Sequence, residues 1–247
     1  MRNRILPLLA ALAVLAFLAG ESRAQTPAGP DREAVERIVR DYLLANPEIV
    51  AEALQTLRAR QEAEEQARAE AAIAENREAI DRHPMSPVSG NAAGDVTVVE
   101  FFDYQCGYCR RALPTMVELL DKDANVRVVW KEFPILGPVS EFAARASMAA
   151  ERQGKYHDFH IRLMGEKDEL SVERIMEVAG LVGLDVAQLG RDMKDPAIQD
   201  YIQETRSLAQ AIGIRGTPSF VIDGVLVRGV VDSARMKELV AAARADG

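Results

Sequence analysis

The stretch Phe101-Phe102-Asp103-Tyr104-Gln105-Cys106-Gly107-Tyr108-Cys109 places a Cys-x-x-Cys pair between an apolar strand and the start of a helix. At a helix N-terminus, unpaired N–H groups and the positive end of the macrodipole favour an anion, so the first sulfur should ionise more readily than a free thiol. A lower thiolate pKa raises the thiolate fraction and makes the sulfur a better leaving group. We therefore predict that Cys106 is the attacking thiol and that Cys109, one turn deeper, is the resolving thiol.

These two cysteines are the only ones in the 247-residue chain, so they act as one pair. A structural staple is a poor explanation, because closing a four-residue loop removes about 2 kcal/mol of chain entropy, against roughly 4.7 kcal/mol for a loop of about a hundred residues. A closed zinc site needs four ligands, and His157 and His160, about fifty residues away, are interpreted as helix-packing or surface residues. We expect no metal site and no cofactor beyond the redox-active Cys106–Cys109 disulfide, although two soft thiolates leave Cu(I) open.

The pattern around the cysteine pair predicts an α/β domain. Residues 96–102 are apolar and mostly β-branched or aromatic apart from Glu100, and 126–133 have a similar character, so both are predicted to be strands. With the intervening helix, about 106–120, they form a right-handed parallel unit. Helical patterns follow over about 138–212, then a hairpin of strands 219–222 and 225–230 around Asp223-Gly224, and a last helix capped by Ser233.

Other residues near this unit fit redox chemistry. Glu100 has apolar neighbours, where a carboxylate is costly unless paired or protonated, so a raised pKa would suit a proton relay for the deeper thiol; a salt bridge at the rim is the alternative. Thr217-Pro218 precedes a strand, and a cis peptide there would lay a backbone edge beside the cysteines for an extended substrate, although a trans turn proline is commoner. Pro114 either kinks the helix that carries the cysteines or is a tolerated interior proline.

The first residues indicate export. Arg2 and Arg4 precede an apolar run over 5–19, and Ser22-Arg23-Ala24 is a small-x-small cleavage sequence, so 1–24 is predicted to be a signal peptide. A membrane anchor is the alternative, but about 15 apolar residues fall short of the roughly 20 that span a bilayer. The formal net charge of −8 becomes −10 when this segment leaves with its net charge of +2, which argues against nucleic-acid binding.

Residues 25–94 are predicted to be largely helical. Two apolar stripes lie at helical spacing over 35–43 and 49–57, and Asn46-Pro47 ends one helix and starts the next, with Asn46 as its N-cap. We interpret 25–57 as an oligomerisation segment and 58–94 as a helical spacer and linker, the helix being solvated because 58–82 are rich in Ala, Glu, Arg and Gln. The alternatives are that both helices pack on their own catalytic domain or that the spacer is partly unfolded.

The motif over 101–109, followed after a long helical insertion by Gly216-Thr217-Pro218-Ser219-Phe220, resembles the DsbA-like thioredoxin-fold proteins of the periplasm. The resemblance covers roughly 95–247 and implies a thioredoxin fold with a helical insertion, preceded by an α-helical stalk. Residues 41–49 resemble the N-terminal segment of ScsC-type proteins, the suppressor-of-copper-sensitivity branch, in which such a stalk oligomerises the catalytic domains. The implied roles are Cys106 as attacking cysteine, Cys109 as resolving cysteine, Glu100 as buried acid and Pro218 as cis-proline, and we assign substrate binding to Thr217, Pro218, Gly107 and Tyr108.

The dipeptide between the cysteines departs from DsbA proper, which has Pro-His. Gly107-Tyr108, with threonine before the cis-proline, is more similar to the dimeric isomerase DsbC, and a shift from about −120 mV toward about −180 mV is roughly 2.8 kcal/mol toward a weaker oxidant. We expect a periplasmic thiol–disulfide oxidoreductase or isomerase with protein disulfides as substrates, a membrane redox partner and a homo-oligomeric state, dimer or trimer. The alternatives are a DsbA-like dithiol oxidase, or a Cu(I)-handling or chaperone protein that uses the same thiols.

Overall fold

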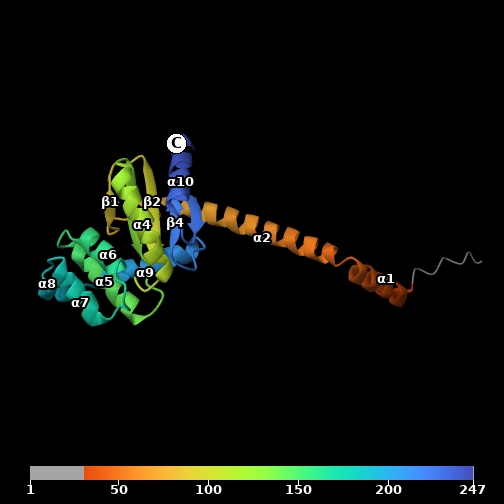
Figure 1. The fold of residues 1–247 in the computed structure, drawn as a ribbon, viewed down its shortest axis with the longest axis horizontal. Helices are drawn as coiled ribbons and strands as arrows, with labels where there is room; N and C mark the ends of the chain where they lie inside the picture. Colours follow the sequence, from red (N-terminus) through yellow and green to blue (C-terminus); the bar gives the residue numbers. More distant parts are fainter. Residues whose placement is uncertain (1–30, 247) are drawn as a thin grey trace, which may run out of the picture. The chain divides into compact units, whose positions relative to one another are not determined.

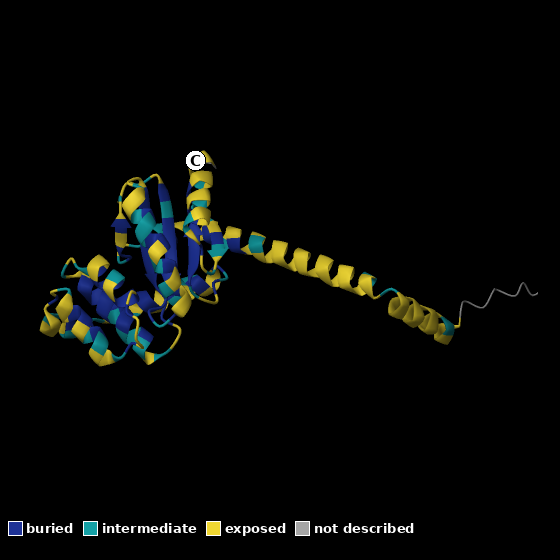
Figure 2. Ribbon diagram, viewed as in Figure 1, coloured by how far each residue is buried: buried dark blue, intermediate teal, exposed yellow. Residues whose placement is uncertain are grey.

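The computed structural model describes residues 31–246, so the predicted signal peptide over 1–24 lies outside the described residues (Figure 1). The chain divides after Arg58 into two compact units. The first contains helix α1 (Arg32–Ala45) and the first turns of α2 (Pro47–Glu75), and no α1 side chain is buried (Figure 2). Over residues 31–246, every helix is too short or too polar to cross a lipid bilayer.

The second unit is built, in its described residues, on a five-stranded sheet with the order β1-β3-β2-β4-β5. The central strand β2 (Val96–Phe102) pairs in parallel with β3 (Val126–Glu132) and antiparallel with β4 (Ser219–Ile222). The strands β1 (Val88–Gly90) and β5 (Val225–Arg228) form the edges. The predicted parallel unit and hairpin are confirmed, and the two turn residues after β4 have positive φ angles, 44° at Asp223 and 89° at Gly224.

Helices cover both faces of this sheet. One face carries α4 (Gly107–Lys122), which runs through Pro114, and α10 (Ser233–Asp246); the other carries α3 (Arg77–Asp81) and the last turns of α2. The chain between β3 and β4 forms the predicted helical insertion, beside the sheet in Figure 1. Its helices are α5 (Pro138–Glu151), α6 (Tyr156–Met164), α7 (Val172–Leu181), α8 (Val186–Asp192) and α9 (Pro196–Ala211).

The alternation of side chains along β2 decides which residues meet the cysteines. Val98 and Phe102 join the hydrophobic cluster that includes α4, whereas Val99 and Phe101 join the cluster on the opposite face. Because successive strand residues point to opposite faces, Glu100 shares the α4 face with Val98 and Phe102. The one acidic residue of the strand is therefore placed under the helix that carries both sulfurs.

The end of the predicted spacer is buried, so the expectation of a solvated helix through residue 82 is wrong for its last turns. The segment 58–68 is largely exposed, but Ala69, Ile73 and Ile80 are 5%, 2% and 0% exposed and pack against Val99 and Phe101 (Figure 2). Ala69 and Ile73 are four residues apart and so share one helix face. Few apolar residues are enough here because they meet a sheet face that is itself apolar. The predicted linker, similarly, contains the edge strand β1.

Of the two capping predictions, the first is confirmed in position and the second is wrong. Asn46 directly precedes α2, which begins at Pro47 as predicted, but its side-chain amide donates to the Tyr42 carbonyl oxygen (2.8 Å) and so closes α1. At the start of α10, Asp232 Oδ1 accepts from the Arg235 N–H (2.8 Å), while the Ser233 hydroxyl donates to a glutamate of α4. At the start of α10 two adjacent polar side chains could accept from the unpaired N–H groups, and the contact of Ser233 with α4 leaves this role to Asp232.

Candidate active site

Cys106 lies between the end of β2 and the start of α4. It is the N-cap residue of α4, with an extended backbone at φ −76° and ψ 112°. Its thiol donates to the Thr217 carbonyl oxygen at an Sγ to O distance of 3.3 Å. The Thr217–Pro218 peptide bond is cis, in agreement with the expectation from the sequence, and Pro218 is buried. The loop before β4 therefore lies against the first sulfur of the pair.

Hydrogen bonds stabilise the thiolate form of Cys106. The Cys109 thiol contributes most, and with the Thr217 side chain and the first backbone N–H groups of α4 it lowers the pKa of Cys106 to about 5, against the opposing effect of burial. The Thr217 carbonyl oxygen can accept a hydrogen bond only from the protonated thiol, so that contact belongs to the neutral form. At neutral pH the balance leaves Cys106 as a thiolate.

At neutral pH Cys109 and Glu100 are mostly protonated, whereas Cys106 is ionised. Cys109 is 1% exposed, against 6% for Cys106, and burial raises its pKa well above the ordinary thiol value, with the Cys106 hydrogen bond and the Glu100 charge acting in the same direction. Burial also raises the pKa of Glu100 to about 8, and the negative charge of Cys106 adds to the effect. The site thus combines one anionic sulfur, one neutral thiol and a carboxyl group that exchanges its proton near neutral pH.

The dipeptide between the cysteines forms the open side of the site. Tyr108 is 58% exposed, and the Arg111 guanidinium lies 4.2 Å from the centre of its ring. A Cβ added at Gly107 would meet no atom within 4 Å apart from its chain neighbours. The five other residues singled out from the sequence therefore lie around the cysteine pair. Glu100 lies in the interior, Thr217 and Pro218 form the loop beside Cys106, and the dipeptide is at the surface.

Asp103 is a site residue that the sequence reasoning missed. It is 1% exposed, and its Oδ2 accepts from the N–H groups of Ile135 (2.7 Å) and Leu136 (2.9 Å). Its Oδ1 accepts from the Gln105 N–H (2.8 Å) and the Ser140 hydroxyl (2.7 Å). The carboxylate therefore ties the loop before Cys106 to the loop between β3 and α5. Its place between two aromatic residues just before the cysteine pair was the available signal, since a short acidic residue there commonly caps a turn.

His157 and His160 lie on α6 and serve surface and packing roles, as predicted. His160 is fully buried; burial lowers its pKa to about 3, and its Nδ1 lies 2.9 Å from the Tyr104 hydroxyl. His157 is exposed, with Nδ1 2.9 Å from the Ser89 hydroxyl. Among the side chains that the structure describes, residues 31–245, no three from His, Cys, Asp or Glu are grouped as metal ligands would be.

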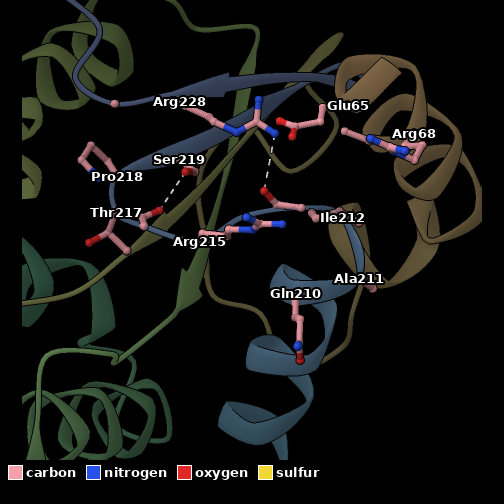
Figure 3. A pocket seen from close by; sticks show the side chains of 14 residues that line it. Glu65, Arg68, Gln210, Ala211, Ile212, Arg215, Thr217, Pro218, Ser219 and Arg228 are labelled. Carbon is pink, nitrogen blue, oxygen red and sulfur yellow. Dashed lines mark hydrogen bonds between the residues drawn. The ribbon is translucent and has the colours of Figure 1, made fainter. Parts of the chain in front are cut away.

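A groove of about 550 Å³ opens beside the Thr217-Pro218 loop (Figure 3). Its walls come from the last turns of α2, the end of α9 with the loop that follows, and the end of β5. Thr217 belongs both to this groove and to the contact with Cys106. Thr217 therefore links the groove to the reactive sulfur.

A central parallel unit, a Cys-x-x-Cys pair at the start of α4, a cis-proline loop against its first sulfur and a helical insertion together define a thioredoxin-fold protein of the DsbA-like class. Residues 97–243 match the DSBA-like thioredoxin domain, and residues 31–64 match the N-terminal domain of the copper resistance protein ScsC. The chain belongs to the DsbA-like thioredoxin domain family, with an ScsC-type N-terminal segment.

Solved structures share this fold. A thioredoxin-like oxidoreductase from Silicibacter pomeroyi DSS-3 is 48% identical, with a TM-score of 0.67 over 69% of this chain and 98% of that one. A linker-deletion mutant of Proteus mirabilis ScsC is 26% identical, with a TM-score of 0.68 over 90% of this chain and all of that one. The thiol-disulfide exchange protein alpha-DsbA2 from Wolbachia pipientis is 29% identical, with a TM-score of 0.68 over 73% of this chain and 97% of that one.

Curated relatives include much longer proteins. The Na(+)/H(+) antiporter NhaA 3 of Salinispora tropica is 32% identical over 139 residues, which are 56% of this chain. The chain spans 21% of the length of that relative. The likeness therefore concerns one part of the antiporter.

Proposed function

We propose that this protein catalyses thiol–disulfide exchange on protein substrates, with Cys106 as the attacking and Cys109 as the resolving cysteine. The observation that carries the proposal is the contrast between the two sulfurs: the pKa of Cys106 is lowered to about 5, and the pKa of Cys109 is raised by burial. Exchange needs a thiolate nucleophile that is reachable and a second thiol that stays protonated until the mixed disulfide has formed.

The reaction proceeds in two displacements. The Cys106 thiolate attacks one sulfur of a substrate disulfide, forms a mixed disulfide and expels the other substrate sulfur as a thiolate. Cys109 then gives up its proton, attacks the Cys106 sulfur and releases the second substrate thiolate. Two electrons have then passed to the substrate, and Cys106 and Cys109 are joined by a disulfide. In isomerisation a substrate thiolate performs the second attack, and the protein ends reduced.

The surrounding residues have supporting roles in this proposal. Glu100, in its ionised form, accepts the proton that Cys109 loses, since it lies on the same buried face. Formation of the mixed disulfide removes the Cys106 charge that helps to raise the Glu100 pKa, and so increases the ionised fraction of Glu100 at this step. Thr217 and Pro218 offer a backbone edge to an extended substrate beside the sulfur. Gly107 and Tyr108 contact the substrate at the surface. The redox-active disulfide is the only group that the reaction requires besides the substrate.

A dithiol oxidase is the second candidate, and the thiolate of Cys106 favours it. Stabilising the thiolate stabilises the reduced protein and so makes the disulfide a stronger oxidant. The Gly107-Tyr108 dipeptide favours the weaker oxidant of an isomerase. The reduction potential of the Cys106–Cys109 disulfide decides between the two candidates. A value of about −120 mV supports the oxidase, and a value of about −180 mV or below supports the isomerase or reductase.

Turnover of scrambled ribonuclease and reduction of insulin test the proposed function directly. The wild-type protein should accelerate both, Cys106→Ser should be inactive, and Cys109→Ser should accumulate mixed disulfides visible on a non-reducing gel. Exchange by Cys106→Ser at the wild-type rate would contradict the proposal. Tight stoichiometric Cu(I) binding without any exchange activity would favour the copper-handling alternative.

The setting of the reaction is also proposed. We place the protein in the periplasm, where an oxidising environment suits a Cys-x-x-Cys pair, with a membrane partner that restores its redox state. We further propose a homo-oligomer held together by the first unit, whose apolar side chains are exposed in the single chain. Those of α1 with the greatest exposure are Ile38 at 68%, Val39 at 51%, Tyr42 at 58% and Leu44 at 75%.

A further inference from the structure

The groove beside the Thr217-Pro218 loop contains three arginines. Arg215 comes from the loop itself, Arg228 from the end of β5 and Arg68 from α2 (Figure 3). Glu65 is the one acidic side chain among the residues that line this space. We call the space of about 550 Å³ between these elements the arginine groove.

The three guanidinium groups keep N–H donors for a ligand, although Arg228 Nη2 donates one hydrogen bond to the Gly213 carbonyl oxygen (3.4 Å). All three residues are exposed, and among the side chains of residues 31–245 no carboxylate pairs with any of them within 4.0 Å. Arg244, by contrast, pairs with Asp95 and Asp123. The whole chain has a formal net charge of −8, so the positive groove is a local feature and not part of a basic surface.

Thr217 connects the arginine groove to the reactive sulfur. It is one of the residues that line the groove, and its carbonyl oxygen is 3.3 Å from Cys106 Sγ. An extended chain advances about 3.3 Å per residue, so a substrate whose cysteine meets Cys106 can place a neighbouring residue in the groove. The volume is also within the range of about 300 to 1,000 Å³ that is typical of ligand sites.

We propose that the arginine groove binds carboxylate groups that lie within a few residues of the reacting sulfur. The inference rests on the proposed function and specifies its substrate class, disulfides flanked by acidic groups. Guanidinium groups recognise carboxylates through paired N–H donors, and the attraction strengthens when both are held in a recess. Acidic side chains of a polypeptide and the two carboxylates of glutathione disulfide share this chemistry.

Single-turnover rates of the reduced full-length protein test the proposal with three disulfides. These are a peptide disulfide with two glutamates beside its cysteine, the same peptide with glutamines, and glutathione disulfide. The wild-type protein should react at least about fivefold faster with the acidic peptide than with the neutral one. Salt near 1 M should abolish this preference, because the Debye length falls to about 3 Å.

Substitutions locate the effect. The triple variant R68Q/R215Q/R228Q should bring the ratio of acidic to neutral rates to about one. R215K keeps the charge but loses the paired N–H donors, so its ratio should fall between those of the wild type and the triple variant. The control R191Q removes an exposed arginine from α8 and should leave the ratio as in wild type. A thiolate titration of the triple variant with its midpoint unchanged shows that the active site is intact.

Equal wild-type rates with both peptides, or an unchanged ratio in the triple variant, would overturn the proposal. Arginine dependence with the acidic peptide assigns the groove to acidic polypeptides, and dependence confined to glutathione disulfide assigns it to glutathione. Absence of exchange with all three disulfides contradicts the proposed function instead. In that event, calorimetry with the acidic peptide carrying serine for cysteine decides the groove: arginine-dependent binding supports it, and its absence overturns it.

Discussion

The thiolate of Cys106 depends first on its partner sulfur. Because the Cys109 thiol contributes the largest share of the lowered pKa of Cys106, Cys109→Ala should raise that pKa from about 5 toward the ordinary value of 9.0. Cys109→Ser keeps a hydroxyl donor and should raise it less. Thiolate absorbance near 240 nm in a pH titration of the reduced protein measures both. A midpoint that stays the same in Cys109→Ala would show that the helix terminus and Thr217 suffice.

Glu100 gives the protein a characteristic pH dependence of stability. Its pKa rises from 4.5 in the unfolded chain to about 8 in the folded one. The contribution of Glu100 protonation to the free energy of unfolding is therefore fully present below pH 4.5 and is lost as the pH rises through 8. Glutamine cannot ionise, so Glu100→Gln should gain stability relative to wild type from pH 5 to 9, on the order of 4 kcal/mol at the upper end. Denaturant unfolding at several pH values measures the difference in the free energy of unfolding between the two proteins. A difference that does not change with pH would contradict the prediction.

Asp103 joins the loop before Cys106 to the loop between β3 and α5. Asp103→Asn keeps the size but loses the charge that receives four hydrogen bonds, and should lower the free energy of unfolding by about 2 kcal/mol. Hydrogen exchange should accelerate at the Ile135 and Leu136 amides, which donate to it. The control Asp121→Asn, at an exposed position of α4, should change neither quantity. Unchanged exchange at both amides would show that the loops hold together without Asp103.

The last turns of α2 should contribute to the stability of the second unit. Ile73 is 2% exposed, so Ile73→Ala should cost about 2 to 5 kcal/mol, while Gln61→Ala on the exposed part of the same helix should cost little. The chain has one tryptophan, Trp130, which is fully buried in the second unit and reports its unfolding by fluorescence. Equal unfolding midpoints for the two variants would show that the last turns of α2 do not contribute to the core.

Local patterns predicted β2, α4, β3, the hairpin and the residues around the sulfur, because apolar periodicity, turn residues and a Cys-x-x-Cys pair at a helix start are each written in a short stretch. The contacts of Asp103 escaped prediction because its loop partners lie 32 to 37 residues further along the chain. The burial of Ile73 escaped for a similar reason: its helix is polar by composition, and only the opposing sheet face makes two or three apolar residues sufficient.

In the intact protein, the first unit should set the number of chains that associate. Its exposed apolar side chains would be covered by further copies, so Val39→Glu with Tyr42→Glu should convert the proposed oligomer into a monomer. Arg40→Gln, on the same helix but polar, should leave the assembly intact. Multi-angle light scattering of the full chain measures the mass. A wild-type protein that is already monomeric would contradict the proposed association.

The anionic sulfur at the start of α4 also determines how the molecule behaves in an acidified medium. At pH 6 an ordinary thiol with a pKa of 9.0 is about 0.1% ionised, whereas Cys106, with a pKa of about 5, is about 90% ionised. Small soluble thiols around the protein would by then be almost inert. The protein would keep its nucleophile through an acid shock that quenches its surroundings, and would lose it only below about pH 5.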